Sequence, residues 1–170
     1  MVAHVCYRHT PEHVFPTPYD DAWDAFEWLS ANLQSIGGDP TQAVIGGISA
    51  GGGLAASVVL RGLQAAESLI QLRGQVLCIP WLFHPNAHPS ASEKWSAPQQ
   101  NADAPILPMP QLRRFVDLMQ VKDPADPIFN AGLATPEQVS GLPKTTILVA
   151  GWDVLRDDGL LYAEILTQAG

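Results

Sequence analysis

Residues 46–53 of the chain are Gly46-Gly47-Ile48-Ser49-Ala50-Gly51-Gly52-Gly53. They overlap the end of an apolar run, Ala43–Gly47, and lead into a helix-forming stretch, Ala50–Glu67. This order predicts a buried strand, a tight glycine turn and a helix in direct succession. A strand that passes into a helix through so short a turn is typical of α/β layered folds with parallel sheets.

The rest of the chain repeats this alternation of strand and helix. Four apolar runs that end at Gly, Pro or a charged residue predict buried strands: Val2–Tyr7, Ala43–Gly47, Gly74–Ile79 and Thr145–Ala150. Four segments with helical periodicity predict helices: Pro18–Leu33, Ala50–Glu67, Pro110–Val121 and Asp157–Gln168. We therefore expect a single α/β domain over residues 1–170, with a mostly parallel sheet, helices on both faces and a Pro-rich, loop-rich insertion at about 81–143.

Composition and charge limit the kinds of molecule that the chain is expected to bind. The 170 residues are 46% hydrophobic and 15% charged, which fits one globular domain with a core. The formal net charge of -8 argues against a nucleic-acid or anionic-membrane surface. We see no signal peptide or membrane span and expect a cytoplasmic protein, in which Cys6 and Cys78 are buried free thiols without metal-ligand spacing.

The segment Gly47-Ile48-Ser49-Ala50-Gly51 fits G-x-S-x-G, the nucleophile elbow, in which a strained turn lifts a serine hydroxyl onto the carboxyl edge of the sheet. We expect small residues at Gly47 and Gly51 to prevent collisions between strand and helix. The Ala50 N–H lies where a helix begins and can donate to a developing oxyanion. The bare motif is also compatible with a purely structural glycine turn.

A catalytic serine needs a base, and the base needs an acid that orients it. Asp153 directly follows the last predicted strand and is our candidate acid. Asp157 and Asp158 compete for the role, but we interpret them as first-turn partners of the helix dipole.

At this point several motifs resemble, in order, those of the hormone-sensitive lipase-like family of α/β-hydrolases. They are Tyr7-Arg8-His9-Thr10-Pro11-Glu12-His13 with Phe15-Pro16, Asp20-Asp21-Ala22-Trp23, Gly47-Ile48-Ser49-Ala50-Gly51-Gly52, Asp123-Pro124-Ala125-Asp126-Pro127 and Asp153-Val154-Leu155-Arg156-Asp157-Asp158-Gly159. The resemblance implies a partial α/β-hydrolase fold and a serine carboxylesterase that acts on small apolar esters, without a metal or other cofactor. It also implies that Ser49 is the nucleophile, Asp153 the triad acid and the Ala50 N–H one oxyanion donor.

The chain also departs from the family pattern. Ile48 stands where family members usually place an acidic residue, the His-Gly-Gly-Gly type loop is absent before Tyr7, and no histidine follows Asp153. His84 or His88 could supply the base only by swinging over the site, because triads are defined by geometry. Without a base and with a reduced oxyanion hole, we expect the chain alone to be nearly inactive.

Two other interpretations remain open. The first is a receptor-like module that binds small molecules without catalysis, and the second is an inactive fragment of a larger esterase. In the family, a further strand lies between the strand that corresponds to Val2–Tyr7 and the strand before Ser49. We expect the isolated chain to be unstable, to pair these two strands directly, or to be completed by a partner, and its unpaired sheet edges favour self-association. Trp81, Leu82 and Phe83 fit either the core or a substrate pocket.

Overall fold

The computed structural model describes residues 1–65, 70–89 and 95–170. Within these ranges the strands are β1 (Ala43–Ile48), β2 (Leu72–Cys78) and β3 (Lys144–Leu148). The longer helices are α1 (Thr17–Asn32), α2 (Ala50–Gln64), α4 (Met109–Met119) and α6 (Arg156–Ala169). The short ones are α3 (Ala97–Gln100), the 3-10 turn η1 (Ala131–Leu133) and α5 (Pro136–Val139). The α/β class and three of the four predicted strands are confirmed.

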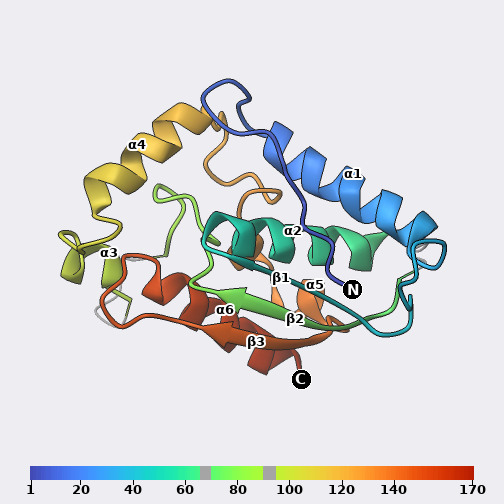
Figure 1. Cartoon of the computed structure of the whole chain (residues 1–170). Coiled ribbons are helices and arrows are strands. Elements are labelled where there is room, and N and C mark those ends of the chain that lie inside the picture. Colours follow the sequence, from blue (N-terminus) through green and yellow to red (C-terminus); the bar gives the residue numbers. More distant parts are fainter. Residues whose placement is uncertain (66–69, 90–94) are drawn as a thin grey trace.

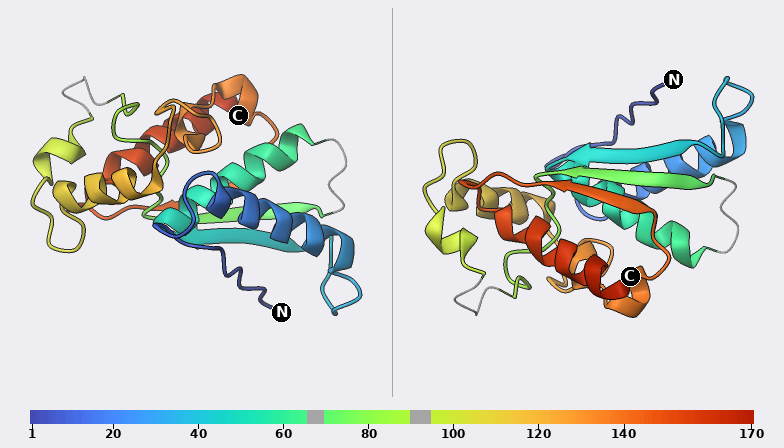
Figure 2. Two further views of the ribbon diagram at one scale, coloured as in Figure 1. Left: turned by 90° about the horizontal axis from the view of Figure 1, so that it is seen from above. Right: turned by 90° about the horizontal axis from the view of Figure 1, so that it is seen from below.

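The three strands form one parallel sheet in the order β1-β2-β3 (Figure 2). In the register, Ile48 pairs with Cys78, which pairs with Leu148. The carboxyl ends of all three strands therefore meet at one edge of the sheet. The loops that follow the strands leave the sheet at this edge, where ligands of open α/β sheets bind.

The main helices cover one face of the sheet, so the expectation of helices on both faces is wrong. Ile45, Leu77 and Ile147 point toward α2 and α6 and belong to one apolar cluster. On the opposite face, Val44 is 61% and Leu148 49% exposed. The strand order explains this for the connections: the right-handed crossovers from β1 to β2 and from β2 to β3 run in the same direction across the sheet, so their helices lie on the same side. Helix α6 follows β3 and packs on that side through the same apolar cluster.

Helix α2 packs against α1 and against β1 and β2 (Figure 1). The face of α1 expected to be apolar does pack inward, because Trp23 and Phe26 are buried against Val58 of α2 and Ile70. Pro18 stands in the first turn of α1, where its missing N–H costs no hydrogen bond. This packing fixes α2, and hence the turn that precedes it.

The predicted strand Val2–Tyr7 does not form. Val2 is 92% exposed, the segment pairs with no described strand, and the amino terminus extends away from the sheet in both views of Figure 2. The expected direct pairing of this segment with β1 is therefore also wrong. An apolar run becomes a strand only when a neighbour accepts its hydrogen bonds, and none lies beside it here. Cys6 is exposed, against the expectation of a buried thiol.

The amino-terminal segment is instead held to α1 at Arg8. The Arg8 guanidinium donates to Asp21 Oδ1 at 2.7 Å, and the Arg8 backbone N–H donates to Asp21 Oδ2 at 2.8 Å. These bonds lower the pKa of Asp21 to about 2. The Tyr-Arg motif and the Asp-Asp motif recognised in the sequence thus contact each other.

The Pro-rich insertion contains α4, as predicted, and also α3, η1 and α5, which the sequence did not indicate. The predicted end of the second helix, Glu67, lies outside the described residues; α2 itself ends at Gln64. Within the described ranges, no helix is long and apolar enough to cross a membrane.

The sheet face that carries Val44 and Leu148 is exposed, and the outer edge of β1 pairs with no described strand. We therefore expect self-association of the isolated chain at high concentration. Val44→Lys places a charge on this face, in the edge strand β1, and should weaken the association about tenfold, because a buried charge disfavours an apolar contact. Analytical ultracentrifugation over a concentration series measures the effect. Trp28→Lys is the matched control, because Trp28 is similarly exposed but lies on α1. Equal weakening by both variants would contradict the proposed interface.

Candidate functional site

Ser49 has the backbone conformation of a strained turn. Its φ is 55° and its ψ is -117°, a region that non-glycine residues rarely occupy and that costs about 1–3 kcal/mol. The Ser49 N–H donates to the Cys78 carbonyl oxygen at 2.9 Å, and the Ser49 carbonyl oxygen accepts from Trp81 N–H and from Gly53 N–H, both at 3.1 Å. The backbone on both sides of Ser49 is therefore tied to the loop after β2 and to α2.

Gly47 is required by this geometry, whereas Gly51 is not. A Cβ atom at Gly47 would overlap the backbone of Gly51, which confirms the expected close approach of strand and helix. At Gly51 an added Cβ would meet no described atom within 4 Å, so the collision expected there is absent. Close contacts also occur at Gly52, whose Cβ would lie 2.9 Å from Pro80 Cβ, and at Gly53, whose Cβ would overlap the Trp81 carbonyl oxygen. On the helix side of the turn, the glycines that allow close approach are therefore Gly52 and Gly53, and not Gly51.

Ala50 is the first residue of α2, and its N–H belongs to the first turn, whose N–H groups have no partner inside the helix. The partial positive charge of the helix end lies at the same place. No described residue forms a hydrogen bond with the Ser49 hydroxyl. The turn therefore presents one hydroxyl and one backbone donor side by side at the carboxyl edge of the sheet.

Asp153 lies in the loop between β3 and α6 and is buried. Its Oδ1 accepts from the Leu155 N–H at 3.0 Å. Its Oδ2 accepts no hydrogen bond from any described residue. Asn101 holds the backbone of the same loop, because its side-chain amide donates to the carbonyl oxygens of Asp153 at 2.7 Å and of Gly151 at 3.2 Å. No local signal in the sequence pointed to Asn101.

Ser49 and Asp153 leave the same edge of the sheet from strands that β2 separates. Two strand spacings, about 10 Å, separate the backbones of β1 and β3, and no described hydrogen bond joins the side chains of Ser49 and Asp153. A ring-shaped base between them would fit this gap. The arrangement brings the two predicted catalytic side chains to one edge and leaves the position between them to a third group.

None of the described histidines contacts Ser49 or Asp153. His84 is buried against Phe129 with 5.6 Å between the ring centres, and its Nδ1 accepts from Asn86 N–H, while burial lowers its pKa. His88 packs edge-on against Phe83. Both rings thus pack against aromatic residues of the core, and neither forms a described hydrogen bond with Ser49.

Asp157 and Asp158 do stand in the first turn of α6, but their main contacts are with distant backbone. Asp158 Oδ2 accepts from the N–H groups of Leu82 and Phe83 at 2.9 and 3.1 Å. His88 Nε2 lies 3.4 Å from Asp158 Oδ1, outside hydrogen-bond geometry. Burial raises the pKa of Asp158, and His88 and the two N–H groups oppose that rise.

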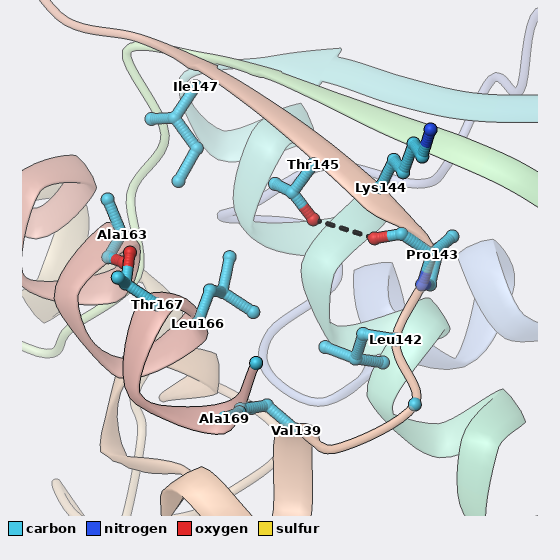
Figure 3. Close-up of a pocket in the computed structure, with 12 residues that line it drawn as sticks. Val139, Leu142, Pro143, Lys144, Thr145, Ile147, Ala163, Leu166, Thr167 and Ala169 are labelled. Atoms are coloured by element: carbon cyan, nitrogen blue, oxygen red, sulfur yellow. Dashed lines mark hydrogen bonds between the residues drawn. The ribbon is translucent and has the colours of Figure 1, made fainter.

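The large apolar residues that follow β2 belong to the core. Trp81, Leu82 and Phe83 are all buried, and the Trp81 indole N–H donates to the Phe83 carbonyl oxygen at 2.8 Å. A pocket of about 410 Å³ lies instead at the amino end of β3, between Leu142, Thr145 and Leu166 (Figure 3). It is at the opposite end of the strand from the edge that carries Ser49 and Asp153, so it is not the site of their chemistry.

Asp123 and Asp126, in the Pro-rich insertion, stabilise turns. Asp123 Oδ1 accepts from Ala125 N–H and Asp126 Oδ1 from Ile128 N–H, which are turn-forming bonds. Among the described residues, no group of three His, Cys, Asp or Glu side chains could hold a metal ion.

Comparison with known proteins relates the whole chain to one family. The family described as alpha/beta hydrolase fold matches residues 1–170. Carboxylesterase NlhH of Mycobacterium tuberculosis is 35% identical over 175 residues, which cover 100% of this chain and 51% of the relative. Versiconal hemiacetal acetate esterase of Dothistroma septosporum is 31% identical over 172 residues, which cover 100% and 52%. The chain spans about half the length of these curated relatives.

Solved structures give the same result. Vibralactone cyclase superposes with a TM-score of 0.87 at 33% identity, over 97% of this chain and 48% of that chain. A thermostable esterase from Pseudomonas putida ECU1011 superposes with a TM-score of 0.84 at 31% identity, over 96% and 49%. The three-stranded arrangement with its covering helices is thus shared with longer proteins.

Proposed function

Because the chain belongs to the α/β-hydrolase fold family, we propose that it carries the nucleophile and the acid of a serine carboxylic-ester hydrolase of the hormone-sensitive lipase-like type. The observation that supports this most is the backbone of Ser49, held at φ 55° between the end of β1 and the start of α2. Strain of this kind at a polar residue is typical of functional sites. Ester hydrolysis is also the activity named for the relatives NlhH and versiconal hemiacetal acetate esterase.

In the proposed mechanism, the Ser49 hydroxyl attacks the ester carbonyl carbon while a base removes its proton. The Ala50 N–H donates to the oxyanion that forms on the carbonyl oxygen, and the alcohol leaves with a proton returned by the base. Water then hydrolyses the acyl-enzyme by the same steps. The substrate is a small apolar ester, and no cofactor takes part.

Asp153 would orient the base through its Oδ2, which accepts from no described residue, since its Oδ1 is already bonded to Leu155 N–H. The order serine, acid, histidine along the chain is the one that α/β-hydrolases use. We propose that the base is a histidine supplied by polypeptide other than residues 1–170. The chain by itself is then a poor catalyst that retains a correctly placed nucleophile. We place this activity in the cytoplasm, where Cys6 and Cys78 stay reduced.

The proposal can be tested by supplying the missing base as free imidazole. A fluorophosphonate probe should label Ser49 slowly in plain buffer and roughly tenfold or more faster when imidazole is added, because a general base contributes about 100- to 10,000-fold when well placed. Ser49→Ala should abolish the labelling, and Asp153→Ala should reduce the imidazole effect. Gel fluorescence and mass spectrometry of the labelled peptide measure both.

Circular dichroism of each variant serves as the folding control. Labelling that persists in Ser49→Ala, or a folded chain that stays unlabelled with imidazole, would contradict the esterase proposal. Measurable binding of small apolar ligands by an unlabelled, folded chain would instead support the receptor-like alternative.

A further inference from the structure

The short helix α3, in the Pro-rich insertion, contacts the loop that carries Asp153. Its carboxyl-terminal cap is Asn101, which is buried. The two hydrogens of the Asn101 side-chain amide are directed to two carbonyl oxygens of one turn, those of Gly151 and Asp153. A single side chain thus fixes the backbone on both sides of Trp152, immediately before the Asp153 carboxylate.

The other end of α3 is held by α6. The Ala97 N–H donates to Asp157 Oδ2 at 2.6 Å, and Asp157 is fully buried. Arg156 bridges the two helices, since its Nε donates to Asp157 Oδ1 at 2.8 Å and its terminal nitrogen donates to Gln100 Oε1 at 3.0 Å. One turn of helix is therefore fixed at both ends to the segments on either side of Asp153.

We propose that Asn101 is a positioning residue for Asp153 and that α3 stabilises the loop between β3 and α6 that carries Asp153. This inference rests on the proposed function. Asn101 acts through the backbone, because its hydrogen bonds fix the carbonyl groups of Gly151 and Asp153. With these groups fixed, Asp153 Oδ1 keeps its hydrogen bond from the Leu155 N–H, and Oδ2 accepts from no described residue. The Pro-rich insertion then contributes to the site although it supplies no reacting group.

Two substitutions separate hydrogen bonding from packing. Asn101→Ala removes the amide, and Asn101→Asp keeps its shape but places carboxylate oxygen against two carbonyl oxygens. Gln100→Ala is the matched control, because it loses the Arg156 contact in the same helical turn and leaves the loop carbonyls bonded to Asn101. The first readout is hydrogen exchange of the Leu155 amide, measured by NMR, which does not depend on any chemistry at Ser49.

We expect the Leu155 amide to exchange roughly tenfold faster in both Asn101 variants and at the unchanged rate in Gln100→Ala, while amides of β2 keep their protection in all three. Unchanged exchange in the Asn101 variants overturns the inference. Restored protection in Asn101→Asp also overturns it, because shape alone would then be sufficient.

The second readout is imidazole-dependent labelling of Ser49, which a purely structural contact far from the site would not alter. We expect labelling about tenfold slower in Asn101→Ala and Asn101→Asp than in Gln100→Ala. Faster exchange without slower labelling overturns the positioning role. An unlabelled but folded parent chain contradicts the proposed function, and it is recognised separately because the exchange result is obtained without the probe.

Discussion

Gly47→Ala is expected to lower the free energy of unfolding by at least about 3 kcal/mol, the scale of severe overpacking. The added Cβ would overlap the backbone of Gly51 at the start of α2. Backbone atoms cannot rotate aside as a side chain can, so either β1 or α2 would have to shift. Urea denaturation followed by circular dichroism measures the loss.

Gly51→Ala is the matched control for this prediction, because it adds the same methyl group four residues away. The new Cβ would meet no described atom within 4 Å. Alanine favours helix over glycine by up to about 1 kcal/mol, so this variant should be as stable as the parent chain or slightly more stable. Similar losses in both variants would show that the turn does not have the geometry described above.

Asp158→Ala has an expected effect of similar size, a loss of about 2–6 kcal/mol in the free energy of unfolding, because each buried donor left without an acceptor costs about 1–3 kcal/mol. The substitution leaves the buried N–H groups of Leu82 and Phe83 without an acceptor and His88 without its acidic neighbour. It would loosen the loop after β2, which also donates Trp81 N–H to the Ser49 carbonyl oxygen. Thermal and urea denaturation measure the effect.

A control is available for the alternative role of Asp158 as a partner of the helix dipole. Asp20 stands in the first turn of α1 but is exposed. Asp20→Ala should cost about 0.3–1 kcal/mol, because a surface dipole interaction and an exposed ion pair, here with Arg61 at 3.8 Å, each contribute little. If Asp158→Ala costs no more than Asp20→Ala, the backbone contacts of Asp158 do not stabilise the fold as proposed.

The parts of the fold that were predicted correctly depend on local signals. The runs at Ala43 and Thr145, the proline at position 18 and the glycines after β1 each determine structure within a few residues. The run Val2–Tyr7 has the same local signal and failed, because strand formation depends on a neighbour that local sequence does not specify. The one-sided helix layer also required the strand order, which follows from pairing across the chain.

The residues of the candidate site also fall into those that local sequence indicated and those that it did not. Ser49 and Asp153 were identified because each directly follows a strand-like run, and both do lie at one edge of the sheet. Asn101 and Asp158 were missed or interpreted as local, because their partners are distant in sequence: Asn101 bonds across 52 positions and Asp158 across 76. No pattern within a window of ordinary length could have indicated these contacts.

The strand order has a consequence for how the chain is made. Each new strand pairs with the strand synthesised just before it, β2 on β1 and then β3 on β2. A nascent chain that leaves the ribosome amino end first can therefore extend its sheet at one growing edge, without inserting a late strand between two that are already paired. Of the three described strands, β1 is synthesised before β2 and has fewer residues between it and its partner than β2 has before β3, so the strained turn at Ser49 can form before the loop that carries Asp153 has been translated.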